Sequence, residues 1–189
     1  MIRFFDIVIS CFGLFLFVPF SPIVLFFCWI ETRSPLIFQK RVGKNLKIFT
    51  LIKFRTMYTN TKISSTHLVD DSSVTKIGNY LRKFKIDEIP QLINVLKGEM
   101  SLVGPRPCLP SQKQLINERN RRNVFSVLPG ITGLSQINGI DMSNPELLAK
   151  SDEKMILDLK LSVYFMYILL TLIGRGLGDK VNYKKSGKK

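Results

Sequence analysis

The sequence predicts one mixed α/β domain seated on an apolar N-terminal membrane segment. Three observations predict it: residues 7–30 carry no charge, β-prone and amphipathic stretches alternate through the rest, and no linker divides residues 33–189. The chain has 189 residues, and 46% of them are hydrophobic, which suits one domain of ordinary size and excludes a disordered chain. We therefore expect a membrane segment over residues 1–32 and a single domain, with a basic C-terminal tail, over residues 33–189.

The chain is strongly basic, with 28 Lys and Arg against 14 Asp and Glu and a formal net charge of +14. Such an excess attracts an anionic partner, which could be nucleic acid, an acidic membrane surface or a phosphorylated substrate. The three cysteines show no metal-ligand spacing, so a disulfide or metal framework is excluded. Composition alone leaves the three classes of partner open.

Residues 7–30 are long enough to enter a membrane, because a helix of this length reaches about 36 Å. Pro19 and Pro22 lie in the middle, and each removes a backbone donor. We expect a sharp kink there, with the Ser21 hydroxyl satisfying a freed backbone group. The segment is then either a bent helix that spans or a re-entrant hairpin. Positive charge on both flanks favours the hairpin, with both ends on the cytoplasmic side.

Three further features concern the membrane surface. Asp6 follows Arg3 by three residues, so we expect the two to pair at the membrane interface. Residues 161–173 are apolar but too short to span, which predicts a core helix or an interfacial helix. The basic tail from residue 175 is either solvated or in contact with anionic headgroups.

The rest of the chain alternates strand and helix signals. Residues 36–42 and 46–54 are β-prone and flank a Gly-Lys-Asn turn, which predicts a hairpin. Residues 57–73, which contain His67, read as a polar surface loop, and residues 75–84 as an amphipathic helix. Later we expect a helix over residues 111–124 with solvated charges at 118–122, a short strand after Pro129, and a helix over 145–159 capped by Ser143 or Asn144.

The stretch from residue 87 to residue 107 is the most informative. Asp87 is suited to cap a helix that has Pro90 in its first turn and ends near Gly98. Residues 100–103 then predict a short buried strand, which ends in Pro105-Arg106-Pro107. Two prolines stiffen that loop, so its arginine is presented from a fixed backbone.

Asp87 and Glu88 are adjacent carboxylates that project about 100° apart on a helix, so they can take separate roles. A carboxylate that approaches an anionic phosphorus is repelled unless cations neutralise the phosphate. Mg²⁺ held by carboxylate and basic side chains supply such charge, and Lys53, Arg55 and Arg106 are the candidates. The alternative is that Asp87 only caps a helix and Glu88 is only a first-turn acid.

Seven segments, in this order, resemble a known family. They are RFFD at 3–6, Ser21-Pro22, QKRVGKN, KFRTM at 53–57, DEIPQLINVLKGEMSLVGPRP, PGITGLSQING and Leu157-Asp158. On these segments the chain resembles the monotopic phosphoglycosyl transferases of the bacterial sugar transferase family. The resemblance implies transfer of a phosphosugar from a nucleoside diphosphate sugar, expected to be a UDP-sugar, to polyprenyl (undecaprenyl) phosphate. It also implies a catalytic domain on the cytoplasmic face of the bacterial inner membrane.

The resemblance implies roles for individual residues. Asp87 corresponds to the nucleophile, which forms an aspartyl-phosphosugar intermediate, and Glu88 beside it is assigned to Mg²⁺. Pro105-Arg106-Pro107 is linked to the nucleotide, and Lys53 and Asp158 match further substrate-binding positions. UMP would leave in the first step, and the polyprenyl phosphate would then attack the intermediate. This would be the first membrane step in the synthesis of a polysaccharide or glycoconjugate.

The Ser21-Pro22 break implies a re-entrant membrane helix. The expected partners are therefore the two substrates and membrane phospholipid, without nucleic acid; a homodimer is left open. Leu134 and Ile140 depart from the aromatic and the arginine that the family usually has, in a region where we expect acceptor or sugar contacts. The chain lacks the N-terminal membrane helices of larger relatives and is expected to be a minimal catalytic unit. The alternative is a non-enzymatic, membrane-tethered basic module that binds anionic lipid or nucleic acid.

Overall fold

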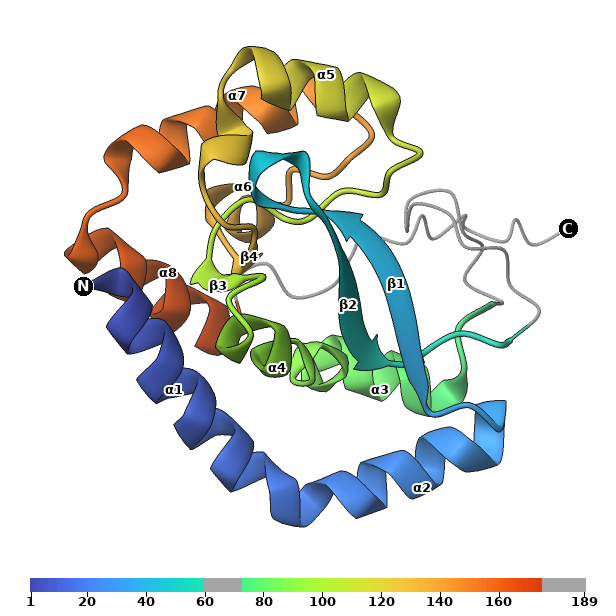
Figure 1. The fold of residues 1–189 in the computed structure, drawn as a ribbon. Coiled ribbons are helices and arrows are strands. Elements are labelled where there is room, and N and C mark those ends of the chain that lie inside the picture. The colour runs from blue at the N-terminus through green and yellow to red at the C-terminus, as the bar shows by residue number, and fades with distance from the viewer. Residues whose placement is uncertain (60–72, 175–189) are drawn as a thin grey trace, which may run out of the picture.

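A computed structural model describes residues 1–59 and 73–174 and shows a small domain of mixed helix and strand that follows a bent apolar helix pair (Figure 1). The first elements are α1 (Ile2–Phe17), the 3₁₀ turn η1 (Val18–Phe20), α2 (Ser21–Thr32), β1 (Leu36–Val42) and β2 (Ile48–Phe54). They are followed by α3 (Lys76–Lys83), the 3₁₀ turn η5 (Ile86–Glu88), α4 (Gln91–Leu96), β3 (Ser101–Val103), α5 (Lys113–Arg121), the 3₁₀ turn η6 (Val124–Ser126), β4 (Gly130–Thr132), α6 (Leu134–Ile137), α7 (Pro145–Asp158) and α8 (Leu161–Leu172). The predicted mixture of helix and strand in one small domain, preceded by an apolar helical segment, is confirmed for the described residues; the re-entrant membrane helix stays a prediction.

The apolar segment bends where its prolines predict. The Ser21 hydroxyl donates to the carbonyl of Val18 at 2.8 Å, so it satisfies a backbone group that the break frees. In Figure 1, α1 and α2 form a V whose two far ends lie against the domain and whose bend points away from it. Within the described residues, Ile2–Thr32 is the one helical stretch long and apolar enough to cross a membrane.

Asp6 fastens α1 to the domain, which corrects the expected pairing with Arg3. Asp6 is buried, and its Oδ1 accepts hydrogen bonds from Ser101 Oγ at 3.0 Å, Leu102 N–H at 2.9 Å and Tyr164 Oη at 2.9 Å. The prediction was wrong because α1 covers β3, whose buried Leu102 amide needs an acceptor. Arg3 donates instead to backbone carbonyls at the end of α4 and the start of β3.

The predicted hairpin is confirmed, and its register sets one face of the site. β1 and β2 are antiparallel, with Gln39 opposite Leu51 and Arg41 opposite Phe49. Because side chains alternate along a strand, Gln39, Arg41, Leu51 and Lys53 share a face. Arg41 reaches from this face to the carbonyl of Pro107 at 3.0 Å. The hairpin is thereby tied to the loop that follows β3.

β3 and β4 form a short parallel pair that requires glycine beside it. Ser101 lies opposite Gly130 in the register. A Cβ on Gly130 would lie 2.0 Å from the Gly104 nitrogen, and one on Gly104 would lie 2.5 Å from the Leu128 carbonyl oxygen. Both distances are shorter than van der Waals contact. The Pro-Arg-Pro loop therefore starts from two backbones in direct contact.

The remaining predicted helices form close to their expected ranges. The side chain of Thr75 caps α3 and that of Asn144 caps α7, as the Ser143-or-Asn144 alternative allowed. In α8, Tyr164 and Tyr167 are buried in the core while Phe165, Met166 and Leu169 are exposed. The helix thus has both a core face and an uncovered apolar face. The loop around His67 and the tail from residue 175 lie outside the described residues.

The predicted helix start at Asp87 is wrong. Asp87 lies inside the three-residue turn η5, and α4 begins only at Gln91 with Pro90 as its N-cap. The backbone bonds here have three-residue spacing: the Ile89 amide donates to the Ile86 carbonyl at 3.1 Å and the Leu92 amide to the Ile89 carbonyl at 3.0 Å. The two acids are therefore held by a tight 3₁₀ turn and not by the end of a long helix.

Candidate active site

A recess open to solvent lies between the hairpin, turn η5 and the Pro-Arg-Pro loop, and we call it the site recess. The recess is shallow, with a volume of about 20 Å³. Its charged and polar lining consists of Arg41, Lys53, Glu88, Gln91 and Arg106. Three cations around one carboxylate give the recess a positive balance, which suits a phosphorylated ligand.

Glu88 and Arg106 form an ion pair in the recess. Glu88 Oε1 lies 3.2 Å from Arg106 Nη1, and the two side chains are 12% and 30% exposed. The other carboxylate oxygen, Glu88 Oε2, is buried and has no hydrogen-bond partner among the described residues. A buried carboxylate oxygen without a donor is costly, so this atom is suited to hold a cation or a ligand donor.

The donor set fits Mg²⁺ better than a metal that needs a full protein cage. The described residues contain no cluster of three or more His, Cys, Asp and Glu side chains that could hold a metal ion. Mg²⁺ is commonly held by one or two carboxylates and completes its shell with water and substrate phosphates. Glu88, with Asp87 next to it, offers that minimal set.

Asp87 lies on the same turn but in other surroundings. Its side chain is 6% exposed, and it is not among the residues that line the site recess. Ile86 packs with Cys28 of α2 and Phe54 of β2, and the Asp87 carboxylate interacts electrostatically with Cys28. Successive side chains on a 3₁₀ turn point about 120° apart, so Glu88 faces the recess while Asp87 lies nearer α2.

The Pro-Arg-Pro loop is held through its carbonyl oxygens, since Pro105 and Pro107 have no N–H. All four carbonyls from Gly104 to Pro107 accept a hydrogen bond, in chain order from Gln136, the Gly130 amide, Arg119 and Arg41. The predicted stiffness of this loop therefore rests on these donors as well as on its two prolines.

The match to known proteins follows the same segments. A family model described as bacterial sugar transferase matches residues 1–174. The chain belongs to the bacterial sugar transferase family. The matched range contains the bent helix pair, turn η5 and the Pro-Arg-Pro loop.

Several curated sugar transferases are similar to the chain. One is the undecaprenyl-phosphate glucose phosphotransferase of Komagataeibacter xylinus, 40% identical over 169 residues, which cover 84% of this chain and 31% of the relative. The uncharacterized sugar transferase EpsL of Bacillus subtilis is 45% identical over 141 residues, 72% of this chain and 68% of the relative. The UDP-glucose:undecaprenyl-phosphate glucose-1-phosphate transferase of Escherichia coli is 36% identical over 190 residues, 94% of this chain and 40% of the relative. The chain thus spans less than half of the first and third relatives.

The structure of this sugar transferase brings together some of the predicted site residues. Lys53, Glu88 and Arg106 line one recess. Arg55 does not line the recess. Its Nε donates to the carbonyl of Ser34 at 2.9 Å, in the segment between α2 and β1. Asp158 is exposed at the end of α7. Burial raises the pKa of Tyr167, and the negative charge of Asp158 raises it further.

Sequence reasoning missed two residues of the recess, Arg41 and Gln91. The alternation of side chains along the hairpin was the available signal for Arg41, because it places Gln39 and Arg41 on the face of Lys53. Gln91 follows Glu88 by three residues, which is one turn of a 3₁₀ helix.

The two positions that depart from the family pattern lie in apolar surroundings. Leu134 packs on the main core beside Met155, and Ile140 packs on a second cluster that contains Leu115 and Leu148. Neither residue lines the site recess.

Proposed function

We propose that this chain transfers a phosphosugar from a UDP-sugar to undecaprenyl phosphate on the cytoplasmic face of the bacterial inner membrane. The observation that carries the proposal is the Glu88–Arg106 pair, which lines a basic recess next to the turn that carries Asp87. The names of the relatives from K. xylinus and E. coli, which specify undecaprenyl phosphate and glucose phosphate transfer, support the same reaction. The reaction is a phosphoryl-group exchange, so positioning and charge neutralisation are the main tasks of the protein.

In the first step an oxygen of the Asp87 carboxylate attacks the phosphorus that bears the sugar. The bond from that phosphorus to the bridging oxygen of UMP breaks, UMP leaves with the electron pair, and an aspartyl-phosphosugar remains. In the second step a phosphate oxygen of undecaprenyl phosphate attacks the same phosphorus. The bond to Asp87 breaks, which restores the carboxylate and yields undecaprenyl diphosphosugar.

The cations of the recess would hold the diphosphate and oppose the repulsion between it and the carboxylate. Arg41, Lys53 and Arg106 line that space. Mg²⁺, held by Glu88 beside Asp87, would supply further neutralisation of phosphate charge when bound. The unpartnered Glu88 Oε2 supports this assignment.

The bent helix pair would place the reaction at headgroup depth. The two far ends of the V lie against the domain (Figure 1). Exposed apolar side chains at the bend include Phe15, Val18 and Phe20. A re-entrant hairpin would bury these side chains in one leaflet and return the chain to the cytoplasmic side. Asp87, which lies nearer α2 than Glu88 does, would then meet a lipid phosphate from the membrane side. The exposed face of α8 would lie in the interface.

Release of UMP tests the proposal. The full chain in membranes is incubated with undecaprenyl phosphate, Mg²⁺ and each member of a panel of UDP-sugars. The panel is needed because the relatives are named for glucose, galactose and N-acetylgalactosamine substrates. We expect UMP release with one sugar or a few, dependent on the lipid. No release from any nucleotide sugar, together with binding to nucleic acid or anionic lipid, would support the basic-module alternative.

Trapping tests the nucleophile. Wild-type chain incubated with a UDP-sugar labelled in the sugar is expected to retain the label covalently, and Asp87→Asn is expected to retain none. Glu146→Gln is the matched control, because Glu146 is an exposed acid that pairs with Lys150 of the same helix at 2.8 Å. Label on the Asp87→Asn chain would show that another group is the nucleophile.

A further inference from the structure

Arg119 is a buried cation that the proposed reaction does not use. It is 1% exposed, although it lies in a run of charges on α5 that was expected to be solvated. Its Nε and Nη2 donate to Asp152 Oδ2 of α7 at 2.9 and 2.7 Å. The expectation was wrong because α5 packs on α7 and places this arginine opposite a carboxylate that is 0% exposed.

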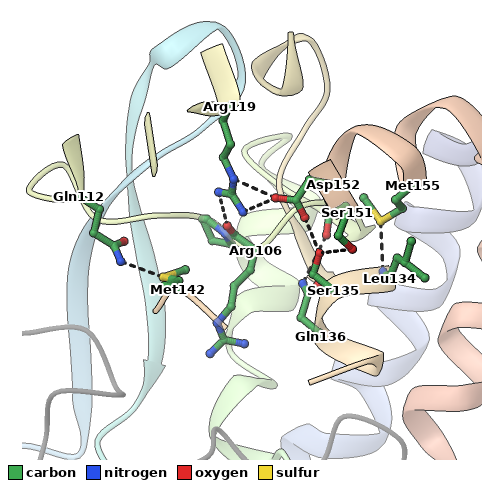
Figure 2. Close-up of polar contacts among 12 residues, drawn as sticks. Arg106, Gln112, Arg119, Leu134, Ser135, Gln136, Met142, Ser151, Asp152 and Met155 are labelled. Atoms are coloured by element: carbon green, nitrogen blue, oxygen red, sulfur yellow. Dashed lines mark hydrogen bonds and ion pairs between the residues drawn. The ribbon is translucent and has the colours of Figure 1, made fainter. Parts of the chain in front are cut away.

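The remaining nitrogen of the same guanidinium, Nη1, contacts the Pro-Arg-Pro loop. Arg119 Nη1 donates to the carbonyl oxygen of Arg106 at 2.7 Å. Figure 2 shows that the backbone of Arg106 meets Arg119 and that the side chain of Arg106 runs in the opposite direction. That side chain forms the ion pair with Glu88. One planar guanidinium thus joins α7 to the residue that closes the site recess.

Asp152 is fixed in turn by its second oxygen. Ser135 Oγ of α6 donates to Asp152 Oδ1 at 2.8 Å and lies 3.0 Å from Ser151 Oγ (Figure 2). Burial raises the pKa of Asp152, while Arg119 and Ser135 act against that shift. The carboxylate therefore has a donor on each oxygen, and Arg119 is left with little freedom to turn away from Arg106.

We infer that Arg119, held by Asp152, is a positioning residue of the transferase: it sets the backbone of Arg106 and so aims the Arg106 guanidinium at Glu88 and at the nucleotide. The inference rests on the proposed function for its catalytic consequence. It assigns Arg119 no contact with substrate. Because Pro105 and Pro107 cannot donate from the backbone, carbonyl oxygens hold this loop, and the carbonyl of Arg106 is the one that accepts from Arg119.

The test removes the donor while it keeps the core filled. Replacing a buried ion pair by apolar residues of similar volume is often neutral for stability. The main variant is therefore Arg119→Met with Asp152→Leu, in which Ser135 retains its contact with Ser151. The second variant is Arg119→Lys, which keeps the charge next to Asp152 but cannot span both partners with one ammonium group.

A matched control lies one turn further along α5. Arg122 Nε lies 3.7 Å from Glu153 Oε2, so this pair also joins the end of α5 to α7. Among the described residues the other ion pair of Arg122 is with Glu118, at 2.7 Å, and not with the Pro-Arg-Pro loop. Arg122→Met with Glu153→Leu therefore alters a tie between the same helices. We expect this control to keep wild-type kinetics.

The kinetic readout separates positioning from general weakening. For both Arg119 variants we expect kcat/KM to fall about tenfold or more, with a higher KM for the UDP-sugar and an unchanged KM for undecaprenyl phosphate. In an Arg106→Ala background the same substitutions should lower kcat/KM by less than about twofold, since the effect passes through Arg106. A folded Arg119 variant with wild-type kcat/KM, or an additive loss in that background, would overturn the inference.

A second readout does not need catalysis. The rate at which an arginine-selective dicarbonyl reagent modifies Arg106, measured by peptide mass spectrometry, should rise about threefold or more in the Arg119 variants and stay constant in the control. An unchanged rate in the Arg119 variants overturns the inference even if the wild-type chain releases UMP. Absence of UMP release from the wild type counts only against the proposed function.

Discussion

At the scale of single residues, the two carboxylate oxygens of Glu88 have different surroundings in the recess. Oε1 is paired with Arg106 at 3.2 Å, whereas Oε2 is buried without a hydrogen-bond partner among the residues described. If the second oxygen is kept for a cation, its environment is costly only while no cation is bound. The same unpartnered oxygen would then favour cation binding and lower the stability of the protein without the cation.

Glu88→Gln tests that division. The amide keeps the size of the side chain but lacks the charge that a Mg²⁺ ligand needs, so we expect kcat to fall about 100-fold or more. The Mg²⁺ concentration for half-maximal rate should rise in any residual activity. The melting temperature should stay within a few degrees of wild type, because no packing is lost. Titration of UMP release against Mg²⁺ measures the first two, and an unaltered Mg²⁺ curve would remove Glu88 from the metal site.

At the scale of elements, the parallel pair of β3 and β4 fixes where the Pro-Arg-Pro loop begins. Gly104 and Gly130 lie in backbone contact, and the Gly104 amide donates to the Thr132 carbonyl at 2.8 Å. Because a methyl group at either position would meet backbone and not a flexible side chain, the neighbouring strand cannot yield without breaking these bonds.

Gly130→Ala should therefore destabilise the fold strongly, by about 3 kcal/mol or more, through overpacking against Gly104. Gly13→Ala is the matched control, since its Cβ would meet only the Leu92 side chain, at 3.0 Å. Thermal unfolding in detergent compares the two. Equal melting temperatures for Gly130→Ala and the wild type would mean that the strands do not approach as closely as described.

Local patterns predicted most elements, while long-range contacts decided the residues that were missed. The hairpin, α3, α7 and the kink at Ser21 follow from alternation, capping and proline, all within a few residues of chain. The burial of Asp6 depends on Tyr164, 158 residues away, and that of Arg119 depends on Asp152, 33 residues away. No periodicity in the sequence signals such pairs. Turn η5 differed because its hydrogen bonds have three-residue spacing, which the capping pattern of Asp87 and Pro90 does not signal.

At the scale of the whole molecule, the charge and the apolar surface are separated. Residues 33–55 carry seven basic residues and no acid, and the hairpin separates these charges. Arg33 follows α2, whereas Lys44 and Lys47 lie at the turn, seven residues of strand further on. Figure 1 places that turn far from the bend of the helix pair. A strand of this length spans about 23 Å, more than twice the Debye length at physiological salt. Much of the described positive charge is therefore too far from the bend to act on the lipid around it.

Membrane attachment should consequently resist salt. The bend exposes large apolar side chains, among them Phe12, Phe15, Phe20, Ile23 and Phe26. Each contributes about 1.5–3 kcal/mol when fully buried, whereas a basic residue near an anionic surface contributes about 1 kcal/mol, which salt screens. We expect the chain to remain with membranes in 1 M NaCl (a Debye length of about 3 Å) and to leave them only in detergent.

Replacing three of the bend side chains, Phe15, Phe20 and Phe26, by Ser should make attachment salt-sensitive, while Lys44→Gln with Lys47→Gln should change nothing. Sedimentation of membranes after each wash, followed by immunoblotting, gives the bound fraction. Release of the wild-type chain by salt alone would mean that charge, and not the apolar bend, holds it to the membrane.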